Sequence, residues 1–355
     1  MSQAKTHAIK QVKAEQGREP FVSVLTPVYN GAAFLEECIQ SVLNQDYENW
    51  EYVLVNNHST DDTLEIMEKY AVKDSRIRIH NNSDFLPQME NLNHAFRQIS
   101  PKSKYCKVVH ADDWLFPECI TKMVAVNEAY PTVGIVSAYR LGGSMDRNYV
   151  ELDGLPYPSN FNLGNEIARK YLMYGTSYFG SPSSILIRSD LIRKRNKVYE
   201  ESLFATDTAA CIDILKESDF GFVHQVLTFT RYHDASITSL DAKQSYAFLH
   251  ARMRSRITYG DYFLSEKERE EAIKSKINLF YILLARNVVQ NRSVKQFKKQ
   301  LKILDELGLK FQTGVFVQKF FREIILSVFS LMGVKLNGRS RKKRKSLANE
   351  PNIEP

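Results

Sequence analysis

Two adjacent carboxylates are the first residues of this chain whose type and spacing could do chemistry. Asp112 and Asp113 come just after the apolar segment 105–109. Neighbouring carboxylates repel each other unless a cation or a hydrogen-bond network relieves the repulsion. Mg²⁺ is commonly held by one or two protein carboxylates together with phosphate oxygens of a substrate. The pair therefore indicates a cation site for a phosphorylated ligand, with a solvated turn after a strand as the alternative.

The elements that must position this pair alternate between strand and helix. Apolar, β-branched segments predict four buried strands, at residues 21–27, 52–55, 77–79 and 105–109. Apolar residues at helical spacing predict a helix between each pair of strands. This alternation predicts a parallel sheet with helices on both faces, which binds ligands at the carboxyl ends of its strands.

Polar segments follow each of these strands. All four are rich in Asn, Asp and Ser: residues 27–30, 56–62, 81–84 and 112–113. Their convergence at one edge of the sheet predicts a single ligand site there. The rest of the chain predicts strands at 133–138, 183–187 and 222–229, a helix at 207–215, and helices from residue 242 onward.

The charge is concentrated in one place. The 355 residues include 48 Lys and Arg against 41 Asp and Glu, a net charge of +7, and six of the positive charges are Arg339 and residues 341–345. Without this run the remainder is near neutral, so a basic surface typical of nucleic-acid binders is absent from the body.

The targeting features predict a cytoplasmic protein. Cys38, Cys106, Cys119 and Cys211 form no CxxC pair and no zinc-type spacing, which is typical of reduced core cysteines. The first twenty residues are polar, so we expect a flexible tail rather than a signal peptide. The chain has no charge-free apolar stretch of about 20 residues, so the sequence predicts no transmembrane helix.

Three ordered motifs resemble those of the family 2 inverting glycosyltransferases. Residues 22–31 (VSVLTPVYNG) with 35–45 (LEECIQSVLNQ) are similar to the opening of that family. Residues 51–63 (EYVLVNNHSTDDT) resemble its second block, and residues 110–113 (HADD) resemble its metal-binding acidic motif. The resemblance covers about residues 21–239.

The resemblance implies an α/β fold: a Rossmann-like, GT-A-type mixed sheet flanked by helices, with a C-terminal helical appendage. The implied domains are a tail at 1–20, a catalytic domain at 21–240 (nucleotide-binding half 21–115, acceptor half 116–240), a helical region at 241–335 and a basic tail at 336–355. The implied activity is metal-dependent transfer, with Mg²⁺ or Mn²⁺, of a sugar from a nucleoside-diphosphate sugar to a saccharide or lipid-linked hydroxyl acceptor. UDP- or dTDP-sugars are favoured as donors, and cell-surface polysaccharide or glycolipid synthesis is the expected setting.

The resemblance also implies the nucleotide-side and metal residues. Pro27 and Tyr29 would lie against the nucleoside. Asn57 stands where the family usually has a base-holding Asp, and its amide can still read a uracil or thymine edge; a turn or capping role is the alternative. Asp113 is the expected metal ligand, and Asp112 is expected to contact the ribose or sugar.

The general base implied by the resemblance is Asp207, which opens the predicted helix at 207–215. A helix N-cap is the alternative role. Asp213 would point about 240° away around the same helix and is a poor substitute. Arg231 and His233 could meet the diphosphate or the metal, and purely structural roles are equally open.

Some residues depart from the family pattern. Asn56, Asn57, His110 and Thr206 occupy positions that are usually acidic. A non-catalytic nucleotide-sugar-binding module is therefore the alternative function. At the C-terminus, an apolar helix at 314–332 precedes the basic run; this pattern suits contact with anionic membrane, at the inner face of the plasma membrane, and docking on the body is the alternative.

Overall fold

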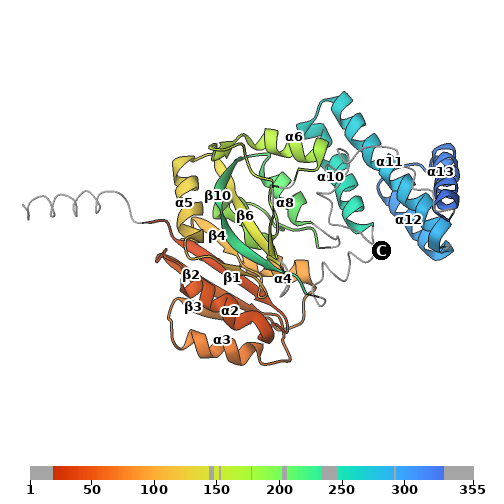
Figure 1. Ribbon diagram of the computed structural model, residues 1–355. Helices are drawn as coiled ribbons and strands as arrows, with labels where there is room; N and C mark the ends of the chain where they lie inside the picture. Colours follow the sequence, from red (N-terminus) through yellow and green to blue (C-terminus); the bar gives the residue numbers. More distant parts are fainter. Residues whose placement is uncertain are drawn as a thin grey trace, which may run out of the picture. The chain divides into compact units, whose positions relative to one another are not determined.

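The computed structural model describes residues 19–143, 148–151, 153–176, 178–201, 206–233, 246–291 and 293–331 (Figure 1). The chain forms two compact units. The first comprises Met1–Tyr171 and Thr176–Asp234, and the second comprises Leu172–Gly175 and Ala235–Pro355. The domain boundary predicted at residue 240 lies outside the described residues and stays a prediction.

The four strands predicted in the first half are present. They are β1 (Val22–Val28), β2 (Trp50–Asn56), β3 (Ile77–Asn81) and β4 (Tyr105–Val108). All their pairings are parallel, and their spatial order is β3-β2-β1-β4 (Figure 1). The predicted alternation of strand and helix is therefore confirmed for this half of the sheet.

Three helices connect these strands: α2 (Ala32–Leu43), α3 (Thr63–Ala71) and α4 (Gln88–Phe96). The apolar stripes of α2 and α3 join one core with the strands, through residues such as Leu35, Ile39 and Met67. The strand order reverses between β1 and β4, which is the point where open α/β sheets bind ligands. The polar loops after β1 and β4 therefore meet at this edge.

The remaining strands make the sheet mixed. β9 (Ile185–Arg188) lies antiparallel between β4 and β6 (Val133–Gly143), and β10 (Asp219–Arg231) runs parallel to β6. The other elements of this unit are β7 (Asn148–Glu151), β8 (Phe161–Asn162), α5 (Cys119–Ala129), α6 (Gly164–Tyr174), the 3-10 turn η1 (Pro182–Ser184), α7 (Ser189–Arg193) and α8 (Asp207–Ile214). A mixed sheet flanked by helices confirms the predicted fold class.

A two-residue strand connects the two halves of the site. β5 (Trp114–Leu115) pairs antiparallel with β10, with Trp114 opposite Phe229. The two rings stack at 3.6 Å with an interplanar angle of 8°. Because the strands are antiparallel, the residues that follow β10 run back beside the acidic turn that precedes β5.

The second unit contains four helices among its described residues after 245, and these confirm the predicted helical C-terminal region. They are α10 (Ala247–Phe263), α11 (Glu266–Asn291), α12 (Val294–Glu306) and α13 (Thr313–Leu331). Their shared core consists of Leu249, Met253, Phe280, Tyr281, Leu284, Leu304 and Leu307. Within the described ranges, no helix combines the length and the apolar character needed to cross a membrane.

A buried histidine makes the stability of this helical unit depend on pH. Nε2 of His250 lies 2.8 Å from Oε1 of Gln300, and burial lowers the pKa of His250 to about 4. In the unfolded chain the same group titrates near pH 6.5. We expect the unfolded state to take up the proton first, so stability is lost as the pH falls from about 6.5 to 4, by up to about 3 kcal/mol.

The measurement is thermal or urea unfolding between pH 4 and 7. His250→Gln cannot titrate, and its amide can still donate to Gln300. This variant should lose most of the pH dependence in that window. The control His58→Gln replaces an exposed histidine and should keep the wild-type profile. Equal slopes for wild type and His250→Gln would contradict the prediction.

Candidate active site

The acidic turn between β4 and β5 places its two carboxylates in different environments. Asp113 is buried at 3% exposure, and its Oδ1 accepts the backbone N–H of Arg231 at 3.0 Å. Its carboxylate also bonds the Ser183 hydroxyl. Asp112 is more open, with its side chain 32% exposed. Only Asp112 therefore offers oxygens that a ligand can reach.

The residues after β10 close over this turn. His233 Nε2 lies 3.1 Å from Oδ2 of Asp112. Arg231 Nε donates to the backbone oxygen of Asp112 at 3.1 Å, and its guanidinium also pairs with Glu37. The same guanidinium lies 4.6 Å from the ring centre of Phe34. The structure thus brings together Asp112, Asp113, Arg231 and His233; their functional roles stay predictions.

Burial and charge repulsion act together on Asp113. Burial, and secondly the charge of Asp112, raise the pKa of Asp113 to about 6. His110 and the hydrogen bonds from Ser183 and Arg231 act in the opposite direction. The negative form of Asp113 is therefore disfavoured, and a positive charge bound beside the turn would stabilise it.

A buried lysine supports the turn from below. Lys107 on β4 has no exposed surface, and its Nζ donates to the backbone oxygens of Ser183 and Ile185, the latter at 3.2 Å. Ser183 in turn accepts the His110 backbone N–H at 3.0 Å. Burial lowers the pKa of Lys107, while the nearby Asp113 raises it. Lys107 and Ser183 thus fasten η1 to the acidic turn.

Lys107→Met is expected to destabilise the sheet unit by about 1–3 kcal/mol. The apolar side chain leaves two buried carbonyl groups without their donor, and an unsatisfied buried polar group costs about this much. Urea unfolding followed by tryptophan fluorescence measures the loss. Lys122→Met, the same change at an exposed position on α5, is the control and should be neutral. Unchanged stability of Lys107→Met would remove the supporting role.

The loop after β1 forms the opposite side of the site. Pro27 lies near the carboxyl end of β1, and Tyr29, just beyond the strand, is 49% exposed. The Tyr29 ring meets Phe85 edge to face, with ring centres 4.8 Å apart. Asn30 has a positive φ of 50° and accepts the Thr60 N–H at 2.8 Å, which holds the loop in place. Two exposed aromatic faces at a strand end suit stacking with a planar base.

Asn57 is less accessible than a base-reading residue needs to be. It is 2% exposed, and its Oδ1 accepts the Leu86 N–H and an amide N–H of Asn82, each at 2.9 Å. Its Nδ2 donates to the Leu86 backbone oxygen at 2.7 Å. These bonds satisfy the amide and tie the end of β2 to the loop after β3. Nucleotide binding by Asn57 stays a prediction that requires Leu86 to move.

Asp207 begins α8, as predicted. Burial raises the pKa of Asp207, while the backbone N–H of Thr208, Arg140 and His110 act to lower it. A carboxylate with a raised pKa accepts a proton more readily, as a general base must. The N-cap of α8 is Thr206, and no side-chain capping bond is formed there, so Asp207 is the first helical residue and not the N-cap. His110 interacts electrostatically with both Asp113 and Asp207, so the acidic turn and the candidate base share one neighbour.

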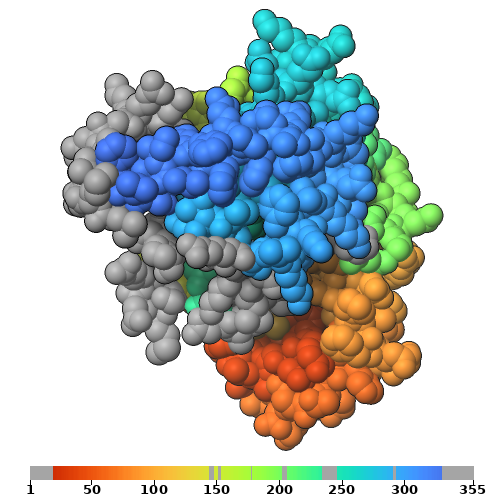
Figure 2. Space-filling model, turned by 90° about the vertical axis from the view of Figure 1, so that its right-hand side faces the viewer, coloured from red at the N-terminus to blue at the C-terminus, as the bar shows by residue number. Residues whose placement is uncertain are grey.

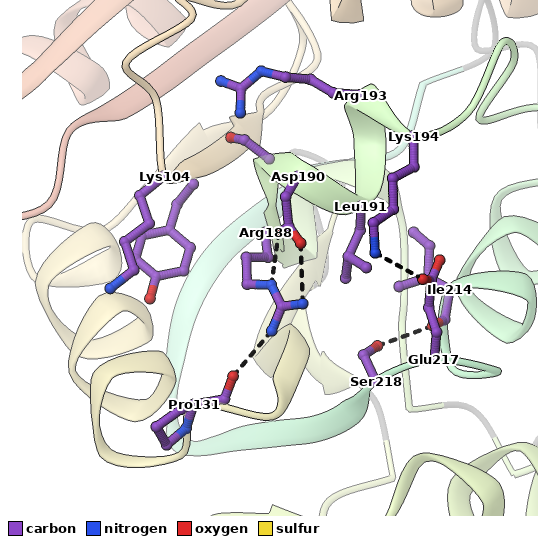
Figure 3. A network of polar contacts seen from close by, with 12 residues as sticks. Lys104, Pro131, Arg188, Asp190, Leu191, Arg193, Lys194, Ile214, Glu217 and Ser218 are labelled. Atoms are coloured by element: carbon purple, nitrogen blue, oxygen red, sulfur yellow. Dashed lines mark hydrogen bonds and ion pairs between the residues drawn. The ribbon is translucent and has the colours of Figure 1, made fainter.

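Ion pairs fix the helix that carries Asp207. Lys194 pairs with Glu217 at 3.0 Å beyond the end of α8 (Figure 3). Arg195 pairs with Asp213 on α8 itself at 2.9 Å. Asp213 is therefore already neutralised within the protein, which agrees with its exclusion as a candidate base.

The residues of the turn fit a shared cation site only in part. Among the described residues, no group of three or more His, Cys, Asp and Glu side chains is placed to hold a metal ion. Asp112 and His233 supply one carboxylate and one imidazole, both partly exposed and 3.1 Å apart. Two protein ligands are the number expected when substrate phosphate oxygens complete the coordination of Mg²⁺ or a similar ion. The protein therefore supplies only part of a cation site, and a bound diphosphate would have to supply the remaining oxygen ligands.

Sequence reasoning missed several residues that build the site. Lys107, Phe34 and Phe85 interact with predicted site residues, yet none belongs to a motif that the sequence singled out; Glu37, which pairs with Arg231, lies within the motif at 35–45 but was given no role there. Lys107 alone carried a signal, because a lysine within a short apolar strand must find buried partners.

Comparisons with known proteins show which sequences this chain resembles. The sequence model described as "Glycosyl transferase family 2" matches residues 23–195. An uncharacterized glycosyltransferase of Haemophilus influenzae is 28% identical over 188 residues, which is 51% of this chain and 56% of that protein. A Campylobacter jejuni protein named GalNAc(5)-diNAcBac-PP-undecaprenol beta-1,3-glucosyltransferase is 25% identical over 276 residues, 76% of this chain and 84% of its own.

Solved structures share the fold. S. aureus TarS 1-349 in complex with UDP-GlcNAc has a TM-score of 0.61 at 16% identity, covering 81% of this chain and 80% of that one. The mannosyltransferase PcManGT from Pyrobaculum calidifontis, in complex with GDP-Man and Mn²⁺, has a TM-score of 0.56 at 12% identity, covering 96% and 91%. Residues 23–195 of the chain therefore resemble glycosyl transferase family 2, and the solved structures show that the chain has the GT-A-type fold.

Proposed function

We propose that this protein is an inverting glycosyltransferase that moves a sugar from a nucleoside-diphosphate sugar to a hydroxyl acceptor. The observation that carries the proposal is the convergence of Asp112, His233 and Arg231 at the switch point of the sheet. A carboxylate, an imidazole and a guanidinium at this edge suit a cation and a diphosphate.

The donor nucleotide would bind between the loops after β1 and β3. The exposed rings of Tyr29 and Phe85 offer a stacking surface for the base, and Pro27, near the carboxyl end of β1, is proposed to contact the nucleoside. A UDP- or dTDP-sugar remains the favoured donor in this proposal. The structural relatives bind UDP-GlcNAc and GDP-Man, so the base and the sugar must be identified by experiment.

Asp207 would act on the acceptor. It takes the proton from the acceptor hydroxyl while that oxygen attacks the anomeric carbon from the face opposite the diphosphate. The bond from the anomeric carbon to the diphosphate oxygen breaks, and its electron pair leaves with the diphosphate. The raised pKa of Asp207 supports this role, and so does its electrostatic interaction with His110, which also interacts with Asp113 of the acidic turn.

Asp112 and His233 would hold a divalent cation, Mg²⁺ or Mn²⁺, together with the diphosphate. When bound, such a cation neutralises the charge that grows on the leaving group. Asp113 would support it from behind, because its carboxylate already accepts bonds from Arg231 and Ser183. The alternative is that Asp113 is itself the metal ligand, as the motif resemblance implies.

The acceptor is proposed to be a saccharide or a lipid-linked glycan. The relative from Campylobacter is named for an undecaprenol-linked acceptor. Polysaccharide or glycolipid synthesis at the cytoplasmic face of the plasma membrane would fit that chemistry. The proposal includes peripheral contact between the protein and this membrane.

The test is a transfer assay with UDP-, dTDP- and GDP-sugars, Mn²⁺ or Mg²⁺, and free or lipid-linked saccharide acceptors. We expect one donor to be consumed only when acceptor and cation are present, and the product linkage to have the opposite anomeric configuration. Calorimetry runs in parallel. Donor binding with no transfer to any acceptor of a broad panel would instead support the non-catalytic nucleotide-sugar-binding module.

A further inference from the structure

Helix α13 carries a row of exposed apolar side chains. Val317, Phe321, Ile325 and Val328 are 41%, 59%, 54% and 47% exposed. At about 100° per residue these four positions fall within about 80° of one another, along roughly 16 Å of the helix. Figure 2 shows α13 as a ridge on this face, with no other described segment lying over it where it is drawn in blue. We name these four residues the α13 stripe.

The rest of the helix is engaged inside the unit. Glu323 is 6% exposed and pairs with Arg286 of α11 at 3.3 Å. Phe316 packs against Phe297 of α12, with ring centres 5.5 Å apart. Glu323 lies about 200° around the axis from Phe321, so the buried charge faces away from the stripe. The stripe is therefore a second apolar face, in addition to the one that builds the core.

The positive charge of the chain gathers around this helix in the sequence. Residues 293–331 contain seven Lys or Arg against three Asp or Glu, and residues 332–355 contain seven against two. Since the whole chain has a net charge of +7, the first 292 residues are slightly negative. Lys295, Lys298 and Lys302 of α12 are all exposed. An apolar face within a basic segment is complementary to an anionic lipid surface.

We infer that the α13 stripe docks the protein on an anionic membrane surface. The four apolar side chains enter the headgroup boundary, and the surrounding Lys and Arg residues lie against the lipid phosphates. This docking would bring the protein close to a lipid-linked acceptor. Only this consequence rests on the proposed function; the docking itself does not.

Charge and apolar character together favour a lipid surface over two other possible partners of the α13 stripe, a second copy of the chain and a nucleic acid. A second copy of the chain would bring another basic segment against the first, and like charges oppose that contact. A nucleic acid would be held by the basic residues without any use for Phe321 or Ile325. Only the lipid surface uses both the apolar row and the excess of Lys and Arg.

The experiment is co-sedimentation of the full chain with vesicles, in the absence of any sugar donor. Vesicles of phosphatidylcholine alone are compared with vesicles that contain about one-third phosphatidylglycerol. We expect binding to the anionic vesicles to be at least tenfold tighter and to weaken in high salt. Phe321→Ser combined with Ile325→Ser should reduce binding to anionic vesicles at least tenfold.

Val294→Ser combined with Tyr262→Ser is the matched control, because it removes equally exposed apolar side chains that lie outside the stripe. It should bind vesicles as the wild type does. Unchanged binding by the stripe variant, no preference for anionic lipid, or a stripe-dependent dimer in light scattering without vesicle binding would overturn the inference. Transfer to a water-soluble acceptor should be the same in the wild type and the stripe variant, so failure of docking and failure of the proposed activity are distinguishable.

Discussion

Asp207→Asn is expected to lower the rate of sugar transfer by about 10²–10⁴-fold, the range typical of a lost general base. Asn has nearly the same shape and keeps an oxygen that can accept the Thr208 N–H, so α8 should still begin at the same residue. Because the side chain acts on the acceptor, binding of the donor nucleotide should stay within about twofold. Steady-state kinetics with saturating donor, together with calorimetric binding of the nucleoside diphosphate, measure the two quantities.

Asp213→Asn is the matched control for this variant. It makes the same change on the same helix, but Asp213 is paired with Arg195 and Lys216. We expect a modest loss of stability and near wild-type turnover. Full turnover by Asp207→Asn would show that Asp207 is not the base, and the base would have to be sought elsewhere.

The second large effect is expected at the acidic turn. Asp112→Asn should weaken nucleoside-diphosphate binding in the presence of Mn²⁺ by at least about 100-fold, because it removes the accessible charged ligand. Asp113→Asn should weaken it by about 10- to 100-fold, the range typical of residues that support a ligand from behind. Calorimetric titrations with and without Mn²⁺ measure both, and unfolding curves check that each variant is folded.

The order of these two losses decides between two assignments. If folded Asp113→Asn loses more of the Mn²⁺-dependent binding than Asp112→Asn, Asp113 is the ligand, as the motif resemblance implies. His233→Gln should resemble Asp112→Asn, because the two side chains are 3.1 Å apart. Asp46→Asn, at an exposed carboxylate outside the turn, should bind as the wild type does.

The local sequence was sufficient to identify the elements of the nucleotide-binding half. Four short apolar segments alternating with amphipathic helices specify parallel strands, since each pattern encodes which face of its own element is buried. The same alternation indicated that the residues after β1 and β4 meet at one edge. The family resemblance followed from motifs within these segments, and the family model matches residues 23–195.

The tertiary structure alone decided how the site is completed. The pairing of two-residue β5 with β10 brings Arg231 and His233 to Asp112, and so short a strand leaves no periodic signal in the sequence. Likewise, only the folded chain shows that Leu86 engages the Asn57 amide and that Lys107 lies beneath the turn.

The physical reason is that the pattern of apolar and polar residues along the sequence determines the local helix or strand. The exposure and the pKa of a side chain depend instead on contacts with residues far away in the sequence. Asp112 and Asp113 are adjacent and chemically identical in the sequence. Packing buries Asp113 and raises its pKa, while Asp112 remains open beside His233. That difference, which no sequence motif encodes, determines which of the two carboxylates a ligand can reach.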